Sequence, residues 1–290
     1  MPRSPGPPRG LLRPHAPAGR FEHARVGPTD DLAPFIAHFW WVRWDLRGHP
    51  PFVTETLPHP TVHLVFDSRC AQIRGVATGA FRKRLHATGY TFGIKFRPAA
   101  FQPWLGAPVS TITDRVLSLH ALAAPLACGI PAITALTRKM GQALLQRVIG
   151  PDPFSSCPGI GQAGVPADAV VAAETFLRAY CPALSGEVAE IRDLVERMAT
   201  DPAITRAEQV AELAGIELRT LQRRFIRFVG VSPKWVLQRY RLHEAAARLT
   251  AADPPTLAAL SASLGYFDQA HFTRDFKAVI GASPSGYRRL

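Results

Sequence analysis

The sequence has few cysteines, and none of them are close together. There are four among 290 residues: Cys70, Cys128, Cys157 and Cys181. Zinc sites and redox sites use closely paired cysteines, so this scatter argues against both. We therefore expect reduced thiols, as in a cytoplasmic protein.

The sequence also lacks an apolar run that would suit a membrane or a signal peptide. Residues 116–137 contain no Asp, Glu, Lys or Arg, but Pro125, Gly129 and Pro131 interrupt them. Such breaks favour short packed helices over one spanning helix. The first 20 residues mix Pro, Gly and Arg without an apolar core, so we expect a disordered leader and no membrane partner.

Acidic residues are too few to balance the basic ones. Lys and Arg number 34 against 22 Asp and Glu, which gives a net charge of +12. Residues 61–150 contribute +9 and residues 201–290 contribute +5. A basic surplus of this kind favours polyanions such as DNA, because binding releases condensed counterions.

The chain divides into a β-rich part and a helical part. Residues 21–115 alternate apolar and polar residues in short runs, which predicts a sandwich or cupin-like barrel. Helical spacing follows over 133–149, 167–180 and 186–199, and Pro and Gly crowd 151–166. We therefore predict an α+β multidomain protein with a leader (1–20), a β-rich sensor domain with trailing helices (21–150), a linker (151–166) and a helical region (167–290).

The last ninety residues contain an internal repeat. At an offset of 51 residues, four identities are Ala211 with Ala262, Leu213 with Leu264, Arg223 with Arg274, and Phe225 with Phe276. The motif Gly-x-Ser-Pro at 230–233 recurs at 281–284. Regular identities without gaps indicate a duplicated structural unit.

Each copy has the pattern of a helix, a tight turn and a second helix. Thr205 and Thr256 are N-cap candidates for the first helices, 207–214 and 257–264. Gly215 or Gly265 follows, where a left-handed backbone costs glycine little. The second helices place apolar residues four apart, so these residues face inward and their neighbours face outward. This is the helix-turn-helix arrangement, whose second helix enters the major groove of DNA.

The outward residues carry the chemistry for reading bases. Arg can contact guanine O6 and N7, Gln can pair with adenine, and an apolar side chain can meet the thymine methyl. The candidates in the first copy are Arg219, Gln222, Arg223 and Arg227, and in the second copy Gln269, Ala270, Thr273 and Arg274. A continuous helical pattern over 233–250 would hold the two units at a fixed separation.

These residues resemble the AraC/XylS family of bacterial transcription regulators. The resemblance covers about residues 205–290 and includes LGYFDQAHFTRDF and the second Gly-x-Ser-Pro with its following Tyr-Arg. It implies a seven-helix DNA-binding domain at about 200–290, with recognition helices near 217–228 and 268–279. The implied base contacts are Arg219, Gln222 and Arg223, and Gln269, Ala270 and Arg274.

The amino-terminal part resembles more loosely the β-rich sensor domains of such regulators. The resemblance implies promoter DNA as partner, a small-molecule effector or dimerisation, RNA polymerase as a further partner, and neither a catalytic residue nor a cofactor. Two other functions stay open. A DNA-repair enzyme fused to the regulator would need a reactive or zinc-binding cysteine arrangement, which the spacing disfavours. An architectural protein would bend DNA without sequence preference.

Three residues of the β-rich part are candidate effector ligands: Trp41, His59 and His63. Glu55 together with the two histidines also invites a metal site, as in cupins. In one strand, however, residues four apart lie about 13 Å from each other, so we favour structural or pocket histidines. The tryptophans around Trp41 suit a core or a dimer surface as well as a pocket. The basic run 82–84 suits a solvated turn, with an anion contact as the alternative.

Overall fold

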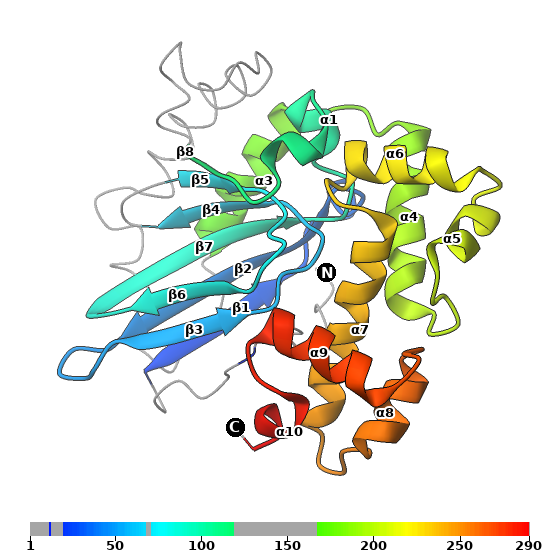
Figure 1. Cartoon of the computed structure of the whole chain (residues 1–290). Helices are drawn as coiled ribbons and strands as arrows, with labels where there is room; N and C mark the ends of the chain where they lie inside the picture. The colour runs from blue at the N-terminus through cyan, green and yellow to red at the C-terminus, as the bar shows by residue number, and fades with distance from the viewer. Residues whose placement is uncertain (1–11, 13–19, 68–70, 119–166, 290) are drawn as a thin grey trace.

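The computed structural model describes residue 12 and residues 20–67, 71–118 and 167–289. A β-rich part comes first in the chain, and the helical part lies against it (Figure 1). The predicted fold class is therefore confirmed. Most of the expected leader, the helix at 133–149 and the linker at 151–166 lie outside the described residues.

The β-rich part consists of two antiparallel sheets. The larger has six strands in the order β1 (Phe21–Val26), β2 (Ile36–Asp45), β7 (Thr88–Phe96), β4 (His63–Asp67), β5 (Ala71–Arg74) and β8 (Val116–Ser118). The smaller is a ribbon of β3 (Phe52–Thr56) paired with β6 (Phe81–Leu85). The two faces of the larger sheet therefore have different neighbours.

Alternation along β2 assigns the two faces. Phe39 and Trp41 are buried on one face, at 0% and 2% exposure, while Trp40 and Val42 point to the other. Behind the buried face lie α1 (Gln102–Leu105), the 3-10 helix η1 (Val109–Ile112) and α3 (Ala167–Ala179), and their apolar residues join one core with the strands. The opposite face is left to a cavity beneath the β3–β6 ribbon.

The helical part contains seven helices, the number that the resemblance implies for the DNA-binding domain. They are α4 (Gly186–Thr200), α5 (Ala207–Leu213), α6 (Leu218–Phe228), α7 (Pro233–Leu249), α8 (Leu257–Ser263), α9 (Gln269–Ile280) and α10 (Pro284–Tyr287). None of the helices in the described part of the chain has both the length and the apolarity needed to cross a bilayer.

Two apolar cores cross the boundary between the β-rich and helical parts. The first runs from the sheet through η1 to α4, α6 and the start of α7, and it includes Ile112 and Phe228. Across this boundary the Thr113 hydroxyl donates to the Gly230 carbonyl over 2.8 Å. The second core buries Leu57, just after β3, among side chains of α7, α8 and α9. The two parts are therefore packed together rather than loosely tethered.

Three local expectations were wrong, and one residue of the expected leader is packed against the chain. Residues 82–84 belong to strand β6 instead of a turn, because they pair with β3 along its length. His59 lies outside the strand that begins at His63. Arg206, not Thr205, is the N-cap of α5, since the Gln209 side chain accepts the backbone N–H groups of both residues. Within the expected leader, Leu12 is 3% exposed and its N–H donates to the Glu55 carbonyl.

Candidate nucleic-acid interface and ligand cavity

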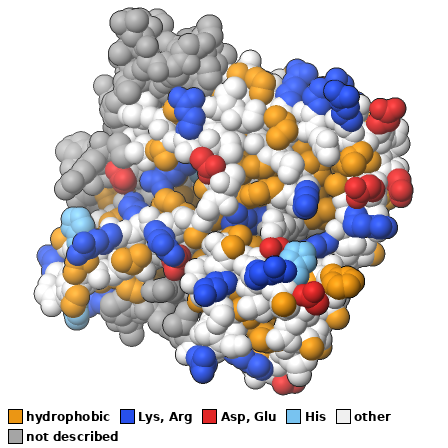
Figure 2. Space-filling view, viewed as in Figure 1, with side chains coloured by type: hydrophobic (Ala, Val, Ile, Leu, Met, Phe, Trp, Pro, Cys, Tyr) orange, Lys and Arg blue, Asp and Glu red, His pale blue; other side chains and the backbone are white. Residues whose placement is uncertain are grey.

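The first helix-turn-helix unit consists of α5 and α6. Gly215 has a φ of 64°, so the turn uses the left-handed backbone expected there. In α6, Leu221 and Phe225 are both 0% exposed and fix the inner face. The sequence candidates lie on the outer face, and all four are exposed: Arg219, Gln222, Arg223 and Arg227. Lys and Arg side chains gather on the surface over this helix (Figure 2).

One arginine of α6 has a structural role that the sequence did not reveal. The Arg224 guanidinium lies 3.0 Å from the Glu190 carboxylate and 3.5 Å from that of Glu187, both on α4. Its side chain is 25% exposed. These contacts hold α6 against α4 and leave the neighbouring Arg223 directed outward.

The second unit repeats this design with α8 and α9. The Asp268 carboxylate caps α9 by accepting from the His271 N–H over 2.6 Å. Phe272 and Phe276 are buried at 0% exposure, as the sequence predicted. Of the outward candidates, Gln269, Ala270 and Arg274 are exposed, and Thr273 is half-buried.

Phe267, which sequence reasoning missed, is the most exposed large apolar residue of the described chain. Its side chain is 95% exposed immediately before the α9 cap. A single exposed apolar residue is common on protein surfaces, so Phe267 is of interest for its position alone. Its place beside Gln269 puts it next to the candidate base contacts.

Helix α7 connects the two units without a break. The Ser232 hydroxyl caps it by accepting from the Trp235 N–H over 3.2 Å, and Pro233 occupies its first turn. Helix α6 lies beyond one end of α7, and α9 lies against the other half (Figure 1). The arrangement gives two outward-facing polar helices at a fixed separation.

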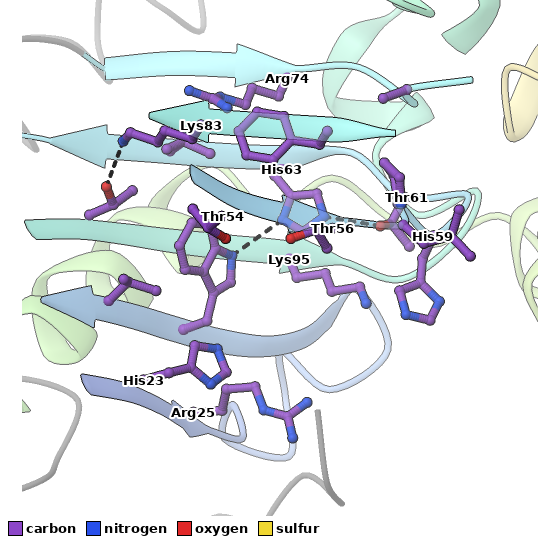
Figure 3. A pocket seen from close by; sticks show the side chains of 18 of the residues that line it. His23, Arg25, Thr54, Thr56, His59, Thr61, His63, Arg74, Lys83 and Lys95 are labelled. Carbon is purple, nitrogen blue, oxygen red and sulfur yellow. Dashed lines mark hydrogen bonds between the residues drawn. The ribbon is translucent and has the colours of Figure 1, made fainter. Parts of the chain in front are cut away.

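A second candidate site is a cavity of about 550 Å³ between the larger sheet and the β3–β6 ribbon. This volume falls within the range of small-molecule sites. Its walls come from β1 to β7 and from the segment between β3 and β4. Figure 3 shows basic side chains of several strands, among them Arg25, Lys95, Arg74 and Lys83, around this space.

Trp40 forms part of the cavity floor, and a glycine makes its position possible. A Cβ on Gly93 would lie 2.1 Å from the Trp40 ring, so only glycine lets the indole lie against β7. The Trp40 indole N–H donates to His63 Nδ1 over 3.2 Å. His63 Nε2 is then free to donate to the Thr61 hydroxyl, 3.2 Å away. This pairing fixes a neutral His63, and burial lowers its pKa to about 3.

Burial and like charges depress the pKa of the other bases here. Burial, then Arg25, lowers the pKa of Lys95 to about 7. Burial also lowers the pKa of His38 to about 2 and that of His23 to about 4, with smaller effects from neighbouring cations. The site therefore contains closely spaced nitrogen bases whose charging is disfavoured.

The three sequence candidates for an effector site have different positions. His59 and His63 both line the cavity. Trp41 does not, because its neighbours Trp40 and Val42 take the cavity face of β2 and leave Trp41 in the core. Choosing Trp41 as a cavity residue was thus wrong by one position. Glu55 is buried and forms an ion pair with the exposed Arg82. No three metal-ligating side chains come together among the described residues.

One wall of the cavity packs against the helix that joins the two units. His59 lines the cavity and stacks on His243 of α7. Pro58, another lining residue, directs its carbonyl toward His243 Nε2 at 3.4 Å. One turn earlier on α7, the buried Arg239 donates to the carbonyl of Thr78 and lies 4.4 Å from the Trp235 ring centroid. Helix α7 therefore touches the wall of the cavity.

Comparisons with known proteins match the two parts separately. A family described as "Domain of unknown function (DUF6597)" matches residues 24–118, and one described as "Helix-turn-helix domain" matches residues 210–290. An uncharacterized HTH-type transcriptional regulator of Haemophilus influenzae is 38% identical over 82 residues, which are 28% of this chain and 27% of that protein. A putative AraC-like transcription regulator of Streptomyces antibioticus is 34% identical over 113 residues, 37% of each chain. The chain thus spans well under half the length of these relatives.

Among solved structures, the C-terminal domain of AraT, a response regulator from Geobacillus stearothermophilus, is 26% identical with a TM-score of 0.32. That match covers 34% of this chain and 84% of AraT's domain. ToxT from Vibrio cholerae is 10% identical with a TM-score of 0.41, over 93% of this chain and 98% of ToxT. From the sequence matches, the chain carries a DUF6597 domain followed by a helix-turn-helix domain of the AraC type.

Proposed function

We propose that this protein is a sequence-specific transcription regulator that reads DNA with α6 and α9 and binds a small-molecule effector in its β-rich part. The observation that carries the proposal is the duplicated unit with exposed polar stripes, joined by the single helix α7. Two rigidly linked recognition helices suit successive major grooves, about 34 Å apart on one face of the duplex.

In this proposal α6 reads bases through Arg219, Gln222 and Arg223, and Arg227 one turn later contacts the backbone or an outer base. Helix α9 contributes Gln269, Ala270 and Arg274, with Thr273 at the edge. Ala270 offers only apolar contact, which suits a thymine methyl. The exposed Phe267 adds apolar surface at the same end of α9.

The cavity supports the effector part of the proposal. Most of its lining belongs to the DUF6597 domain, and its wall borders α7 through the His59–His243 contact. A ligand in the cavity can therefore act on α7, the helix that sets the distance between α6 and α9. We assign residues 21–150 to sensing and about 200–290 to DNA binding, and a homodimer and RNA polymerase remain proposed partners.

A regulator fused to a DNA-repair enzyme is less well supported. Such an enzyme needs an activated cysteine, and Cys181 is the one cysteine within the described residues. Burial raises the pKa of its thiol, which disfavours the reactive thiolate. The AraC-type match further favours regulation over catalysis.

Selection from a random duplex library in excess competitor DNA tests the proposal. We expect enrichment of a motif with two half-sites about one helical turn apart. An architectural protein would bind without enriching any motif, and that result would overturn the proposal.

A further inference from the structure

The side chains that line the cavity are basic, apolar or threonine, and none of those in the described chain is acidic. Strand register aligns four of them across the sheet: His38 pairs with Lys95, Lys95 with His63, and His63 with Arg74. We call these four residues the basic row. Burial keeps His38 and His63 neutral, so Lys95 and Arg74 are the cations of this row. Cations gathered in a cleft favour a ligand of the opposite sign.

The row beside it is apolar. Trp40, Gly93 and Val65 are aligned across β2, β7 and β4, two residues from the basic row on each strand. The indole of Trp40 fills the space above Gly93. Arg25 of β1 pairs with Trp40 in register and lies at the same end of the cavity as Lys95 (Figure 3). A charged end therefore adjoins a flat apolar floor.

Lys95 is the cation of this site that most needs a partner. Lys83, on the opposite ribbon, contacts the Thr91 hydroxyl at 3.0 Å and the Asp67 carboxylate at 3.9 Å. Arg74 contacts Gln72 at 3.1 Å and lies over the Phe81 ring. For Lys95, by contrast, no hydrogen bond or ion pair occurs with any residue that the structure describes. Lys95 is half-buried, and withdrawing an ammonium from water without a counter-charge is costly.

We propose that the cavity binds a monocarboxylic acid with an aromatic or similarly flat apolar body, its carboxylate at Lys95 and Arg25 and its body against Trp40 and Val65. This ligand class rests on the proposed function, since it identifies the effector. The carboxylate would supply the negative counter-charge for Lys95, and the apolar body would cover the floor formed by Trp40 and Val65.

Two other classes fit less well. A neutral ligand would leave Lys95 desolvated and unpaired. A phosphate ester carries up to two charges and is usually held by backbone N–H groups at helix N-termini. Here strands line the charged end, and their N–H groups are committed to the sheet. A single carboxylate can be bound by side-chain cations alone, which Lys95 and Arg25 provide.

Isothermal titration calorimetry on the full chain tests the proposal with three matched probes: 2-naphthoate, 2-naphthamide and 2-naphthyl phosphate. We expect 2-naphthoate to bind at least tenfold more tightly than either of the others. Lys95→Met should remove the preference for the acid over the amide. Met retains the length of Lys without a charge to desolvate, so this variant should fold, as circular dichroism will check.

Lys234→Met is the matched control, because it removes an exposed lysine of α7 that does not line the cavity. Its affinity for 2-naphthoate should stay within threefold of the wild type. The proposal is overturned if none of the probes binds, if the amide or the phosphate binds as tightly as the acid, or if Lys95→Met keeps the preference. Promoter binding is measured separately: its loss would overturn the proposed function and leave the ligand result standing.

Discussion

The imidazole rings of His59 and His243 lie parallel, with centroids 4.0 Å apart and planes 13° apart. His59 belongs to the wall of the ligand cavity, and His243 belongs to the helix between the two DNA-reading units. Both rings also lie near Tyr240, whose centroid is 6.2 Å from His59 and 6.4 Å from His243. This aromatic cluster connects the wall of the cavity directly to α7.

Replacing His243 with Leu should weaken the effect of a bound acid on DNA affinity. Coupling between two sites is commonly 5- to 150-fold, and we expect the wild-type ratio to fall toward one in this variant. The measurement is DNA affinity by fluorescence anisotropy, with and without saturating 2-naphthoate. His49→Leu, in an exposed turn, is the control. An unchanged ratio for His243→Leu would mean that the signal travels elsewhere.

Arg223→Ala should lose about 1 to 3 kcal/mol of binding free energy at one base position and little at the others. The measurement compares the affinities of the wild type and the variant for operators changed at single bases. Arg224→Ala is the matched control: it should lose the ion pairs to α4, cost about 1 kcal/mol or less of stability, and keep base preference. Uniform loss across all operators would assign Arg223 to the phosphate backbone instead.

Phe276→Ala should destabilise the second unit by about 3 to 5 kcal/mol, because it empties a site that is 0% exposed. The Phe276 ring packs between Phe272 and Tyr287, at 5.6 and 5.5 Å between centroids. Thermal or urea unfolding gives the loss. Lys277→Ala, on the exposed side of the same turn, should change stability by less than about 0.5 kcal/mol. Equal effects of the two substitutions would contradict this burial.

Gly93→Ala should displace the Trp40 ring from the cavity floor. The added methyl meets the ring at 2.1 Å, so either the indole moves or the strand shifts, at a cost of about 1 to 3 kcal/mol. Urea unfolding and the tryptophan emission spectrum should both change. Gly79→Ala is the comparison, since its Cβ would have no neighbour within 4 Å. A Gly93→Ala protein with wild-type stability and emission would show that the floor is not closely packed.

The stability of the unliganded protein should rise between pH 7 and about pH 10. Lys95 has a pKa of about 7 when folded, well below its ordinary value of 10.5. Between these values the unfolded chain binds more protons, so raising the pH favours the folded state. The groups that face Lys95 are the rest of the basic row, Arg25 from β1 and His59 from the β3–β4 segment.

Scanning calorimetry of the wild type and of Lys95→Met between pH 7 and 9.5 measures this contribution. The difference in melting temperature between the two proteins should narrow as the pH rises, because the cost of burying the charged amine disappears. A constant difference would mean that Lys95 is not desolvated.

The duplicated helical unit was predictable because its signals are local. Four-residue spacing of Leu221 with Phe225 and of Phe272 with Phe276 fixes an inner face, and the repeat confirmed one copy with the other. The β-rich part was predictable as strands but not as a site. Whether Trp40 or Trp41 faces the cavity depends on register with β7, and a one-residue difference moves a side chain to the other face.

The pairing of β3 with β6 joins residues 52–56 to residues 81–85, and nothing within either segment specifies its partner. The basic row takes its four members from four strands, and β2 and β7 are distant in sequence from the β4–β5 pair. Only the assembled sheet therefore shows that His38 and Lys95 are neighbours of His63 and Arg74. Local spacing could identify His59 and His63 as candidates and could not reveal Lys95.

The packing of η1 on α6 limits how such a regulator can be taken apart or recombined. In the intact chain Ile112 and Phe228 are 0% and 2% exposed, and both belong to the core that the two parts share. A DNA-binding domain separated from the rest of the chain near residue 200 would expose this apolar surface to water and would tend to aggregate. In a chimera, a sensor domain from another protein would need a surface complementary to α6. Sensor and DNA-binding domains of this design should therefore be exchanged together.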